Sequence, residues 1–364
     1  MTDETNKISN GIKVSAPGKL MLFGEHAVVY NRPCLVAAVN QRLFVDVEKH
    51  SENKILIDAP EMKISDFSVS LADLDKEQPK EVRFVLEAVK NFFRKYNVES
   101  GLKIKTESQF SAEYGFGSSS AVTVCTIKAL SELFGIKMDK KEIFNLAYKT
   151  VLDIQGVGSG FDIAAAIYGG IIYFVTGGKI IEPLNVKSIP LIVGYTGVKA
   201  STSEIVKQVK AEMDKKPEYY DKLYDDIAQI VEKARPELEN SNWQEVGRLM
   251  NKNQEILRKF TPHLSQDEQS NNLTHNQQAF AHQGKGAGFK VPSFEYGVSS
   301  EIIEKLVGAC LGAGAYGVKL SGAGVGDCIV ALGENKEVIE KAISEAGGTP
   351  VSVDVDYRGL KIEN

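Results

Sequence analysis

The sequence has no apolar run that approaches the length of a membrane-spanning helix, about 20 residues. Its first ten residues are polar and contain no hydrophobic region of the kind found in secretory signal peptides. These two absences predict a cytoplasmic protein with no membrane partner.

Cysteine and net positive charge are also scarce. The four cysteines form no CxxC pair, and this spacing argues against a disulfide framework and against a zinc site. They are predicted to be small buried hydrophobic residues. Lys and Arg number 43 against 48 Asp and Glu, a net charge of −5, which argues against nucleic acid or a membrane surface as a partner. A small basic pocket remains compatible with this balance.

The composition that is present, 43% hydrophobic and 25% charged residues in a chain of 364, supports a large core and two domains. The predicted strands and helices intermix without the steady βαβ rhythm of a doubly wound sheet, so we predict an α+β fold. Gly177, Gly178 and Pro183 interrupt the chain. We therefore predict a domain boundary in this region, with domains 1–182 and 183–364.

Hydrophobic periodicity predicts the individual elements. Residues 81–96 have apolar side chains at helical spacing, whereas residues 43–47 alternate like a strand. Residues 261–293 are polar, show neither period, and are predicted to be a disordered insertion. The predicted strands are 12–16 and 20–23 (separated by a break at Pro17 and Gly18), 35–39, 43–47, 103–106, 171–175, 191–195, 318–320, 328–332 and 351–355, and the predicted helices are 81–96, 118–135, 140–152, several within 204–259, 300–311 and 336–346.

The most informative motif is Gly-Phe-Gly-Ser-Ser-Ser at residues 115–120, directly before a long predicted helix. Glycines let successive backbone N–H groups converge on an anion, and a helix N-terminus adds its own unpaired N–H groups. The serine hydroxyls suit helix capping, binding of phosphate oxygens or ligation of Mg²⁺. Taken alone, the motif leaves phosphate binding and helix capping open.

A second motif near the N-terminus carries three titratable groups. Lys19 follows Pro-Gly at the predicted strand break, and Glu25 and His26 come soon after it. A lysine at such a break is well placed to point toward a ligand. By itself, however, each of these residue types is more often a solvated charge or a structural histidine.

Two further glycine-rich stretches complete the pattern. Asp162 follows the stretch 156–161 and fits either a general base or a helix N-cap. The stretch 319–327, Lys-Leu-Ser-Gly-Ala-Gly-Val-Gly-Asp, fits either a close backbone approach to a ligand or a simple turn. A lysine, an anion loop, an aspartate and a second glycine loop together favour phosphoryl transfer, which depends on positioning and charge neutralisation.

The order of these motifs resembles the three signature motifs of the GHMP kinases, which phosphorylate small alcohols. The resemblance covers nearly the whole chain, and residues 24–30 (Gly-Glu-His-Ala-Val-Val-Tyr) and 194–202 are most similar to the branch that phosphorylates mevalonate. It implies an N-terminal domain of the ribosomal protein S5 type, a ferredoxin-like C-terminal domain and an active site between them. It also implies ATP-dependent phosphorylation of mevalonate for isoprenoid precursors, with ATP and Mg²⁺ bound, and a homodimer.

The resemblance further implies roles for individual residues. Asp162 is expected to be the catalytic base, and Lys19 is expected to lie beside the substrate hydroxyl and to steady its developing charge. The ATP phosphates are expected on the loop formed by Gly115, Phe116, Gly117, Ser118, Ser119 and Ser120, with Ser119 as the hydroxyl on the Mg²⁺ side. The residues expected to contact the substrate are Lys19, Glu25, His26, Thr196, Gly322, Ala323 and Gly324.

Two departures from the family pattern concern the metal and the substrate. The mevalonate branch has a glutamate that completes the Mg²⁺ site eleven residues before the base, where this chain has Val151. Asp153, two residues out of register, is the candidate for a substitute metal ligand. The base loop, residues 155–162, instead resembles the branch that phosphorylates phosphomevalonate. That substrate carries a phosphate and favours additional cations in the pocket, for which Arg42 and Lys199 are candidates.

Phosphomevalonate kinase activity is therefore the main alternative. A diphosphomevalonate decarboxylase has the same fold, but Lys19 after Pro-Gly and the Gly-Glu-His run argue against it. A non-catalytic relative is a further alternative. The presence of both Lys19 and Asp162 argues against a non-catalytic relative. Val151, which stands where the family has a glutamate, leaves this alternative open.

Overall fold

In a computed structural model, which describes residues 11–260 and 297–363, the chain forms two packed units. Unit 1 consists of Met1–Leu22, Val28–Ile189 and Val353–Asn364, and unit 2 consists of Phe23–Ala27 and Pro190–Ser352. Each unit thus combines segments that are distant in sequence. The linear division at residues 182 and 183 remains a prediction about domains.

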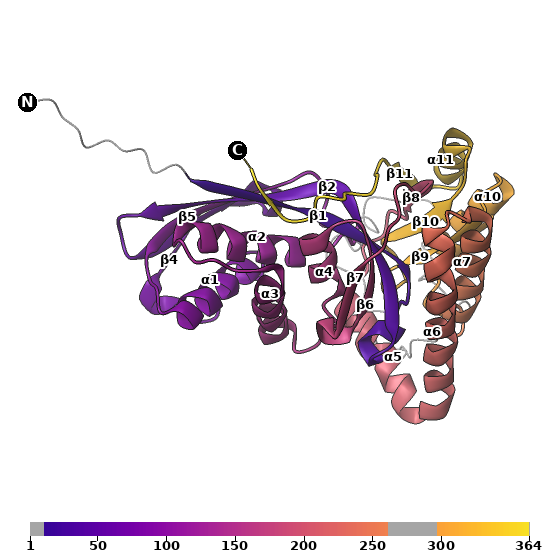
Figure 1. Cartoon of the computed structure of the whole chain (residues 1–364), viewed down its shortest axis with the longest axis horizontal. Coiled ribbons are helices and arrows are strands. Elements are labelled where there is room, and N and C mark those ends of the chain that lie inside the picture. The colour runs from indigo at the N-terminus through magenta and orange to yellow at the C-terminus, as the bar shows by residue number, and fades with distance from the viewer. Residues whose placement is uncertain (1–10, 261–296, 364) are drawn as a thin grey trace, which may run out of the picture. The chain divides into compact units, whose positions relative to one another are not determined.

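Unit 1 is built on an eight-stranded sheet (Figure 1). Alternation sets which side chains enter its core: in β5, Leu102, Ile104 and Thr106 are buried while Lys103 and Lys105 are exposed. The strand order is β12-β1-β2-β5-β3-β4, β6 pairs with β2 and β7, and the bounds are β1 Ile12–Phe23, β2 Pro33–His50, β3 Lys54–Ala59, β4 Ile64–Ser70, β5 Gly101–Ser108, β6 Ile171–Val175, β7 Ile180–Pro183 and β12 Lys361–Ile362.

Four helices cover one face of this sheet (Figure 1). The second of them is rich in small and apolar residues and is buried along most of its length, so it forms the centre of this layer. The third begins with a capping box, in which Asp139 and Glu142 satisfy each other's backbone N–H groups. The helices are α1 Arg83–Tyr96, α2 Ser118–Leu133, α3 Lys140–Gln155 and α4 Phe161–Tyr168.

Unit 2 is built on an antiparallel four-stranded sheet in the order β11-β8-β10-β9. Side chains of α7 cover the edge strand β9: Asn251 Oδ1 accepts from the Val318 N–H at 2.9 Å, and Gln254 Oε1 accepts from the Leu320 N–H at 3.0 Å. This covering protects the edge from pairing with another chain. The elements are β8 Leu191–Tyr195, β9 Gly317–Ser321, β10 Cys328–Leu332, β11 Thr349–Val351, α5 Thr202–Lys215, α6 Pro217–Glu239, α7 Trp243–Leu257, α10 Glu301–Gly312 and α11 Lys336–Glu345.

Two predicted breaks in the first strands are wrong. β1 continues through Pro17 and Gly18. Gly18 lets the strand pass close to the 115–120 loop, since a Cβ there would lie 3.1 Å from the Phe116 Cβ. β2 joins the two strands predicted at 35–39 and 43–47, because tertiary contacts hold the polar residues between them. Asn40, for example, donates its N–H to Asp354 O at 2.8 Å.

Some elements were missed by the prediction, and one predicted strand is split between the two units. β3, β4, β7, β12 and α4 were not predicted, and the expected last strand, 351–355, is divided: Val351 pairs with Val193 in unit 2, and Val355 bridges Val39 in unit 1. The predicted insertion, residues 261–293, lies outside the described residues. The remaining strands and helices lie close to the predicted ranges, and the α+β class is confirmed.

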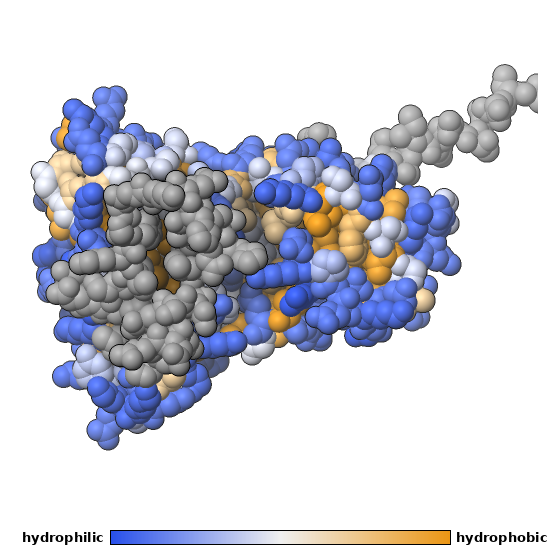
Figure 2. All heavy atoms as spheres, turned by 180° about the vertical axis from the view of Figure 1, so that it is seen from behind, coloured by the Kyte–Doolittle hydropathy of each residue, from blue (hydrophilic) through white to orange (hydrophobic). Residues whose placement is uncertain are grey.

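The part of the chain that the structure describes contains no helix with the length and apolarity needed to cross a bilayer. On the face shown in Figure 2, hydrophilic residues predominate, and hydrophobic residues gather in one area of unit 1. The four cysteines are buried, as predicted, and form no disulfide among the described residues; burial raises the pKa of the Cys310 thiol to about 12.

Candidate active site

The N-terminus of α2 presents backbone N–H groups that the helix itself does not use. The cap residue is Gly117, with a left-handed φ of 78° and no side chain to cap the helix. The first N–H groups used inside the helix are those of Ser120 and Ala121, each 3.1 Å from Gly117 O. Among the described residues, the N–H groups of Ser118 and Ser119 have no backbone acceptor. The helix-capping alternative for the serines is therefore wrong, and the anion-binding alternative stands.

Lys19 lies against this loop. Its backbone N–H donates to Phe116 O at 2.9 Å, and its Nζ donates to Gly115 O at 2.5 Å. The ammonium also lies 5.5 Å from the centre of the Phe161 ring, at the start of α4. The lysine of the first motif and the glycines of the second, almost one hundred residues apart, thus meet at one place in unit 1.

Asp162 also lies next to Gly117. Ser120 Oγ donates to Asp162 Oδ2 at 2.5 Å, and the Ile163 N–H donates to Oδ1 at 3.1 Å. A Cβ at Gly117 would be 3.2 Å from Lys19 Cε and 3.6 Å from Asp162 Cβ, so the lysine and the aspartate both lie next to this glycine. The cap of α4 is Gly160, so the N-cap alternative for Asp162 is wrong. The carboxylate is oriented by a hydroxyl and a backbone N–H instead.

The loop before Asp162 is held by Tyr148, a residue that the sequence analysis did not identify. Its Oη donates to Gly158 O at 2.8 Å, and its ring packs so closely that a Cβ at Gly160 would be 3.0 Å from Cδ2. Burial and the nearby Asp162 charge raise the pKa of Tyr148. The sequence gives only a weak signal for this role, because a single tyrosine on a helix can equally be a core or a surface residue.

We expect Tyr148→Phe to lower kcat by about two- to tenfold, because loss of one hydrogen bond, about 0.5–1.5 kcal/mol, loosens the loop that places Asp162. Steady-state kinetics of the purified variant measure this effect. Tyr168→Phe at the far end of α4 is the matched control and is expected to keep the wild-type kcat. Equal losses in both variants would contradict a role of Tyr148 in placing the loop.

The structure does not place Asp153 in this site. Its carboxylate accepts from Asn91 Nδ2 at 2.9 Å and pairs with Lys149, and these partners lower its pKa although partial burial opposes them. Val151, in contrast, is buried and faces the base loop: a Cβ at Gly158 would lie 3.7 Å from its Cγ1. The interpretation of Asp153 as a substitute metal ligand is therefore wrong, because two residues along a helix point to different sides.

The remaining predicted residues lie in unit 2, where Glu25 forms a buried ion pair with Lys319 of β9. Both side chains are fully buried, and Lys319 Nζ also donates to Leu320 O at 2.5 Å. Burial raises the pKa of Glu25 and lowers that of Lys319, while the mutual attraction opposes both shifts. Among the described residues, Glu25 Oε2 has no hydrogen-bond partner by geometry, although the backbone of Gly322 also lowers the pKa of this carboxyl.

His26 is equally enclosed. Its Nε2 is 3.0 Å from Ala323 O, its ring stacks on Phe260 at 5.3 Å between centroids, and its backbone has a left-handed φ of 59°. Burial lowers its pKa to about 4. The imidazole is therefore neutral near pH 7, with Nε2–H donating to the carbonyl.

This burial predicts a loss of stability between about pH 6.5 and pH 4. In that window the unfolded chain binds a proton at His26 and the folded chain does not, so the free energy of unfolding falls as the pH falls, by about 3 kcal/mol in full. Urea unfolding at pH 7, 6 and 5 should show a weaker pH dependence for His26→Gln than for the wild type. His50→Gln, at the end of β2, is the control; a wild-type slope in His26→Gln would contradict the assignment.

Thr196 and the 322–327 loop form one hydrogen-bonded turn. Thr196 donates both its N–H and its hydroxyl to Asp327 O, each at 2.9 Å, and Asp327 Oδ1 accepts from the Ala200 N–H at 2.9 Å. Val325 has a φ of 66°, which is rare for a β-branched residue. Strained backbone of this kind concentrates at ligand-binding sites.

The glycines of this loop differ in what surrounds them. Gly322 has open space around the position of a Cβ, whereas a Cβ at Gly324 would lie 2.3 Å from Val298 O. Gly324 is therefore required by packing within unit 2, whereas no described atom would contact a Cβ at Gly322. Ala323 between them is buried and accepts from His26. The structure thus describes the predicted site residues as two clusters, one in each unit.

The two candidate cations for a second substrate phosphate have different surroundings. Arg42 is 3% exposed and donates to four protein oxygens, so it is not available to a ligand. Lys199 is exposed on the loop after β8. The prediction that Arg42 binds a second substrate phosphate is wrong, because taking a buried guanidinium away from its buried partners is strongly unfavourable.

Comparison with known proteins defines the class. Residues 83–170 match the family model "GHMP kinases N terminal domain", and residues 276–349 match "GHMP kinases C terminal". The curated mevalonate kinase of Pyrococcus furiosus is 33% identical over 363 residues, which cover 96% of this chain and 97% of that protein. The chain belongs to the GHMP kinase family, a class of enzymes that use ATP as a substrate, and the resemblance noted in the sequence is confirmed.

Solved structures agree on the fold. The mevalonate kinase of Methanococcus jannaschii superposes with a TM-score of 0.73 at 24% identity, covering 98% of this chain and all of that one. A phosphomevalonate kinase from Streptococcus pneumoniae superposes with a TM-score of 0.72 at 16% identity, covering 94% and 99%. These structures share the architecture, whereas the full-length relative with the higher identity is a mevalonate kinase. The two-domain GHMP kinase fold is therefore confirmed.

Proposed function

We propose that this chain transfers the γ-phosphoryl group of ATP to mevalonate and forms 5-phosphomevalonate, a step toward isoprenoid precursors. The observation that carries the chemistry is the placement of Lys19 and Asp162 next to Gly117, at the start of α2. The identity to a mevalonate kinase over nearly the full length supports the choice of substrate.

In this proposal Asp162 is the catalytic base. Its carboxylate accepts the proton of the substrate hydroxyl, and the hydroxyl oxygen attacks the γ-phosphorus while the bond from that phosphorus to the oxygen bridging it to the β-phosphate breaks and ADP leaves. The Ser120 hydroxyl and the Ile163 N–H hold the carboxylate in one orientation. Lys19, anchored by Gly115 O, supplies the positive charge that stabilises the developing alkoxide.

The loop of residues 115–120 binds the ATP phosphates. The N–H groups of Ser118 and Ser119 and the positive end of the α2 dipole attract the anion. Among the described residues, no group of three or more His, Cys, Asp or Glu side chains is placed to hold a metal ion. Ser119 Oγ and Asp162 are hard oxygen donors that would hold Mg²⁺ together with phosphate oxygens and water, and the ion would neutralise phosphate charge.

The cluster in unit 2 binds the substrate. The vacant acceptor Glu25 Oε2 suits a hydroxyl, and the turn that joins Thr196 to the 322–324 loop offers backbone groups near the open space at Gly322. His26 supports this loop through Ala323 O. These assignments keep the residues predicted from the sequence, with His26 acting through the loop.

The test is an assay of ADP release by the purified protein with Mg·ATP and either mevalonate or phosphomevalonate. Turnover of mevalonate with little turnover of phosphomevalonate supports the proposal. Turnover of phosphomevalonate alone contradicts the substrate assignment and favours the second branch of the family. Release of CO₂ from diphosphomevalonate would identify a decarboxylase instead.

A further inference from the structure

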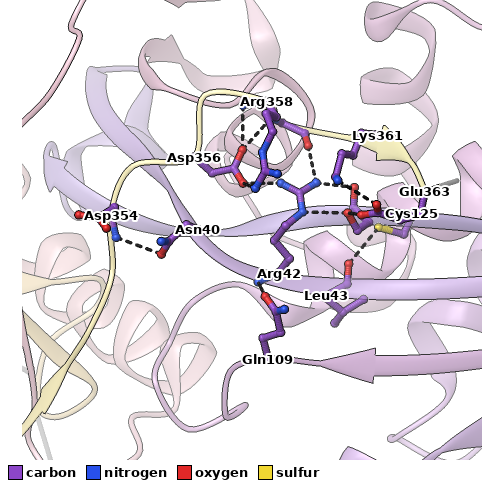
Figure 3. Close-up of polar contacts among 12 residues, drawn as sticks. Asn40, Arg42, Leu43, Gln109, Cys125, Asp354, Asp356, Arg358, Lys361 and Glu363 are labelled. Carbon is purple, nitrogen blue, oxygen red and sulfur yellow. Dashed lines mark hydrogen bonds and ion pairs between the residues drawn. The ribbon is translucent and has the colours of Figure 1, made fainter.

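A buried ion pair lies outside both clusters, between Arg42 of β2 and Asp356 near the C-terminus (Figure 3). The two residues are 3% and 2% exposed, and Arg42 Nη1 is 2.5 Å from Asp356 Oδ2. Arg42 also donates to Ser15 Oγ at 2.8 Å, to Ser15 O at 2.9 Å and to Gly359 O at 2.7 Å. Asp356 Oδ1 accepts from the N–H groups of Arg358 and Gly359. Such a network defines one arrangement of the segments that it joins.

One of these segments holds the end of α4, the helix that carries Asp162. The Leu360 N–H donates to Ile167 O at 3.2 Å. Gly169, which ends α4, lies so close to the C-terminal segment that a Cβ there would be 2.5 Å from Gly359 N. The position of α4 along its axis therefore depends on where the segment 356–360 lies.

The same guanidinium holds β1, and the next residue of β2 contacts α2. Ser15, which receives two of its hydrogen bonds, lies in β1 four residues before Lys19. Leu43, the residue after Arg42, accepts a weak hydrogen bond from Cys125 Sγ of α2 at 3.7 Å. The ion pair is thus adjacent to all three elements that carry Lys19, the 118–120 serines and Asp162.

We propose that Arg42 and Asp356 are positioning residues for phosphoryl transfer. They contact neither the candidate phosphate loop nor Asp162. Their buried pairing fixes β1 against the C-terminal segment and, through that segment, fixes α4. This keeps Lys19 Nζ on Gly115 O and Ser120 Oγ on Asp162, contacts in which a displacement of about 1 Å costs up to about 10²-fold in rate. The inference rests on the proposed function.

The experiment compares Arg42→Lys, Arg42→Met and Asp356→Asn with a matched control, Arg358→Met. Arg358 pairs with the same carboxylate, but its side chain is 58% exposed. We expect kcat per folded molecule to fall about tenfold or more in the first three, with KM for ATP and mevalonate within about threefold of wild type. Arg358→Met is expected to keep kcat within about twofold of wild type. If Arg42→Met does not fold, Arg42→Lys and Asp356→Asn carry the test.

Two further measurements separate positioning from simple stabilisation. In a Ser120→Ala background, Arg42→Lys should cost much less in kcat than in the wild type, because both changes act on the same Asp162 contact. Hydrogen exchange of peptides from 161–170 should be faster in Arg42→Lys and unchanged in Arg358→Met. Folded variants with wild-type kcat, or losses that simply add to that of Ser120→Ala, would overturn the inference. Wild-type protein that does not phosphorylate mevalonate would overturn the proposed function alone, since the exchange data need no substrate.

Discussion

Asp162→Asn is expected to lower kcat for mevalonate phosphorylation by about 10³-fold, because a general base contributes about 10²–10⁴ and an amide cannot accept the substrate proton. The amide keeps the size of the carboxylate and can still accept from Ser120 Oγ, so the loop should retain its shape. Affinity for ATP is expected to stay within about threefold of wild type, since the phosphate-binding N–H groups belong to α2. Calorimetric titration of nucleotide and single-turnover kinetics measure the two quantities.

Asp153→Asn is the matched control for this prediction. Asp153 is also an aspartate in the α3–α4 region, but its side chain is committed to Asn91 and Lys149 on the surface. We expect its kcat to remain within about twofold of wild type. Near-normal turnover in Asp162→Asn would show that the base is another group. A large loss in Asp153→Asn that additional Mg²⁺ restores would return Asp153 to the metal site.

Lys319→Met is expected to destabilise unit 2 by about 3–5 kcal/mol, the usual cost of leaving one member of a buried ion pair without its partner. Glu25 and Lys319 are both fully buried, so water cannot replace the lost ammonium. Urea or thermal unfolding measures the change. Lys149→Met is the control: it makes the same substitution in the more exposed pair with Asp153, and we expect it to lower the free energy of unfolding by less than about 1 kcal/mol.

The pH dependence of this effect has a definite sign. Burial raises the pKa of Glu25, and loss of Lys319 raises it further. The folded variant then holds a proton that the unfolded chain has released above its ordinary pKa, so the stability of the variant falls as the pH rises. Lys319→Met should therefore be closest to wild type near pH 5 and furthest from it near pH 8. Adding Glu25→Gln should remove this trend; an unchanged trend would show that Glu25 is not the group responsible.

Much of the local structure could be predicted because it depends on short-range patterns. The helical period of 81–96 appears as α1, and the glycine-serine motif stands at the start of α2. The merger of two predicted strands into β2 could not be predicted, since Arg42 looks like a strand-breaking polar residue until its buried partners are known. The same holds for Tyr148, whose role depends on a loop ten residues away.

The sequence by itself determined the α+β class, the order of the motifs and the residue types available for phosphoryl transfer, because glycine spacing and hydrophobic period act over a few residues. Only the tertiary structure decided which groups meet. The Ser120 hydroxyl orients the Asp162 carboxylate. Lys319 pairs with Glu25, which lies 294 residues before it in the chain. Arg42 pairs with Asp356 across 314 residues rather than with a substrate phosphate. Such pairs depend on how the segments pack around buried charge, and no local pattern in the chain encodes that distance.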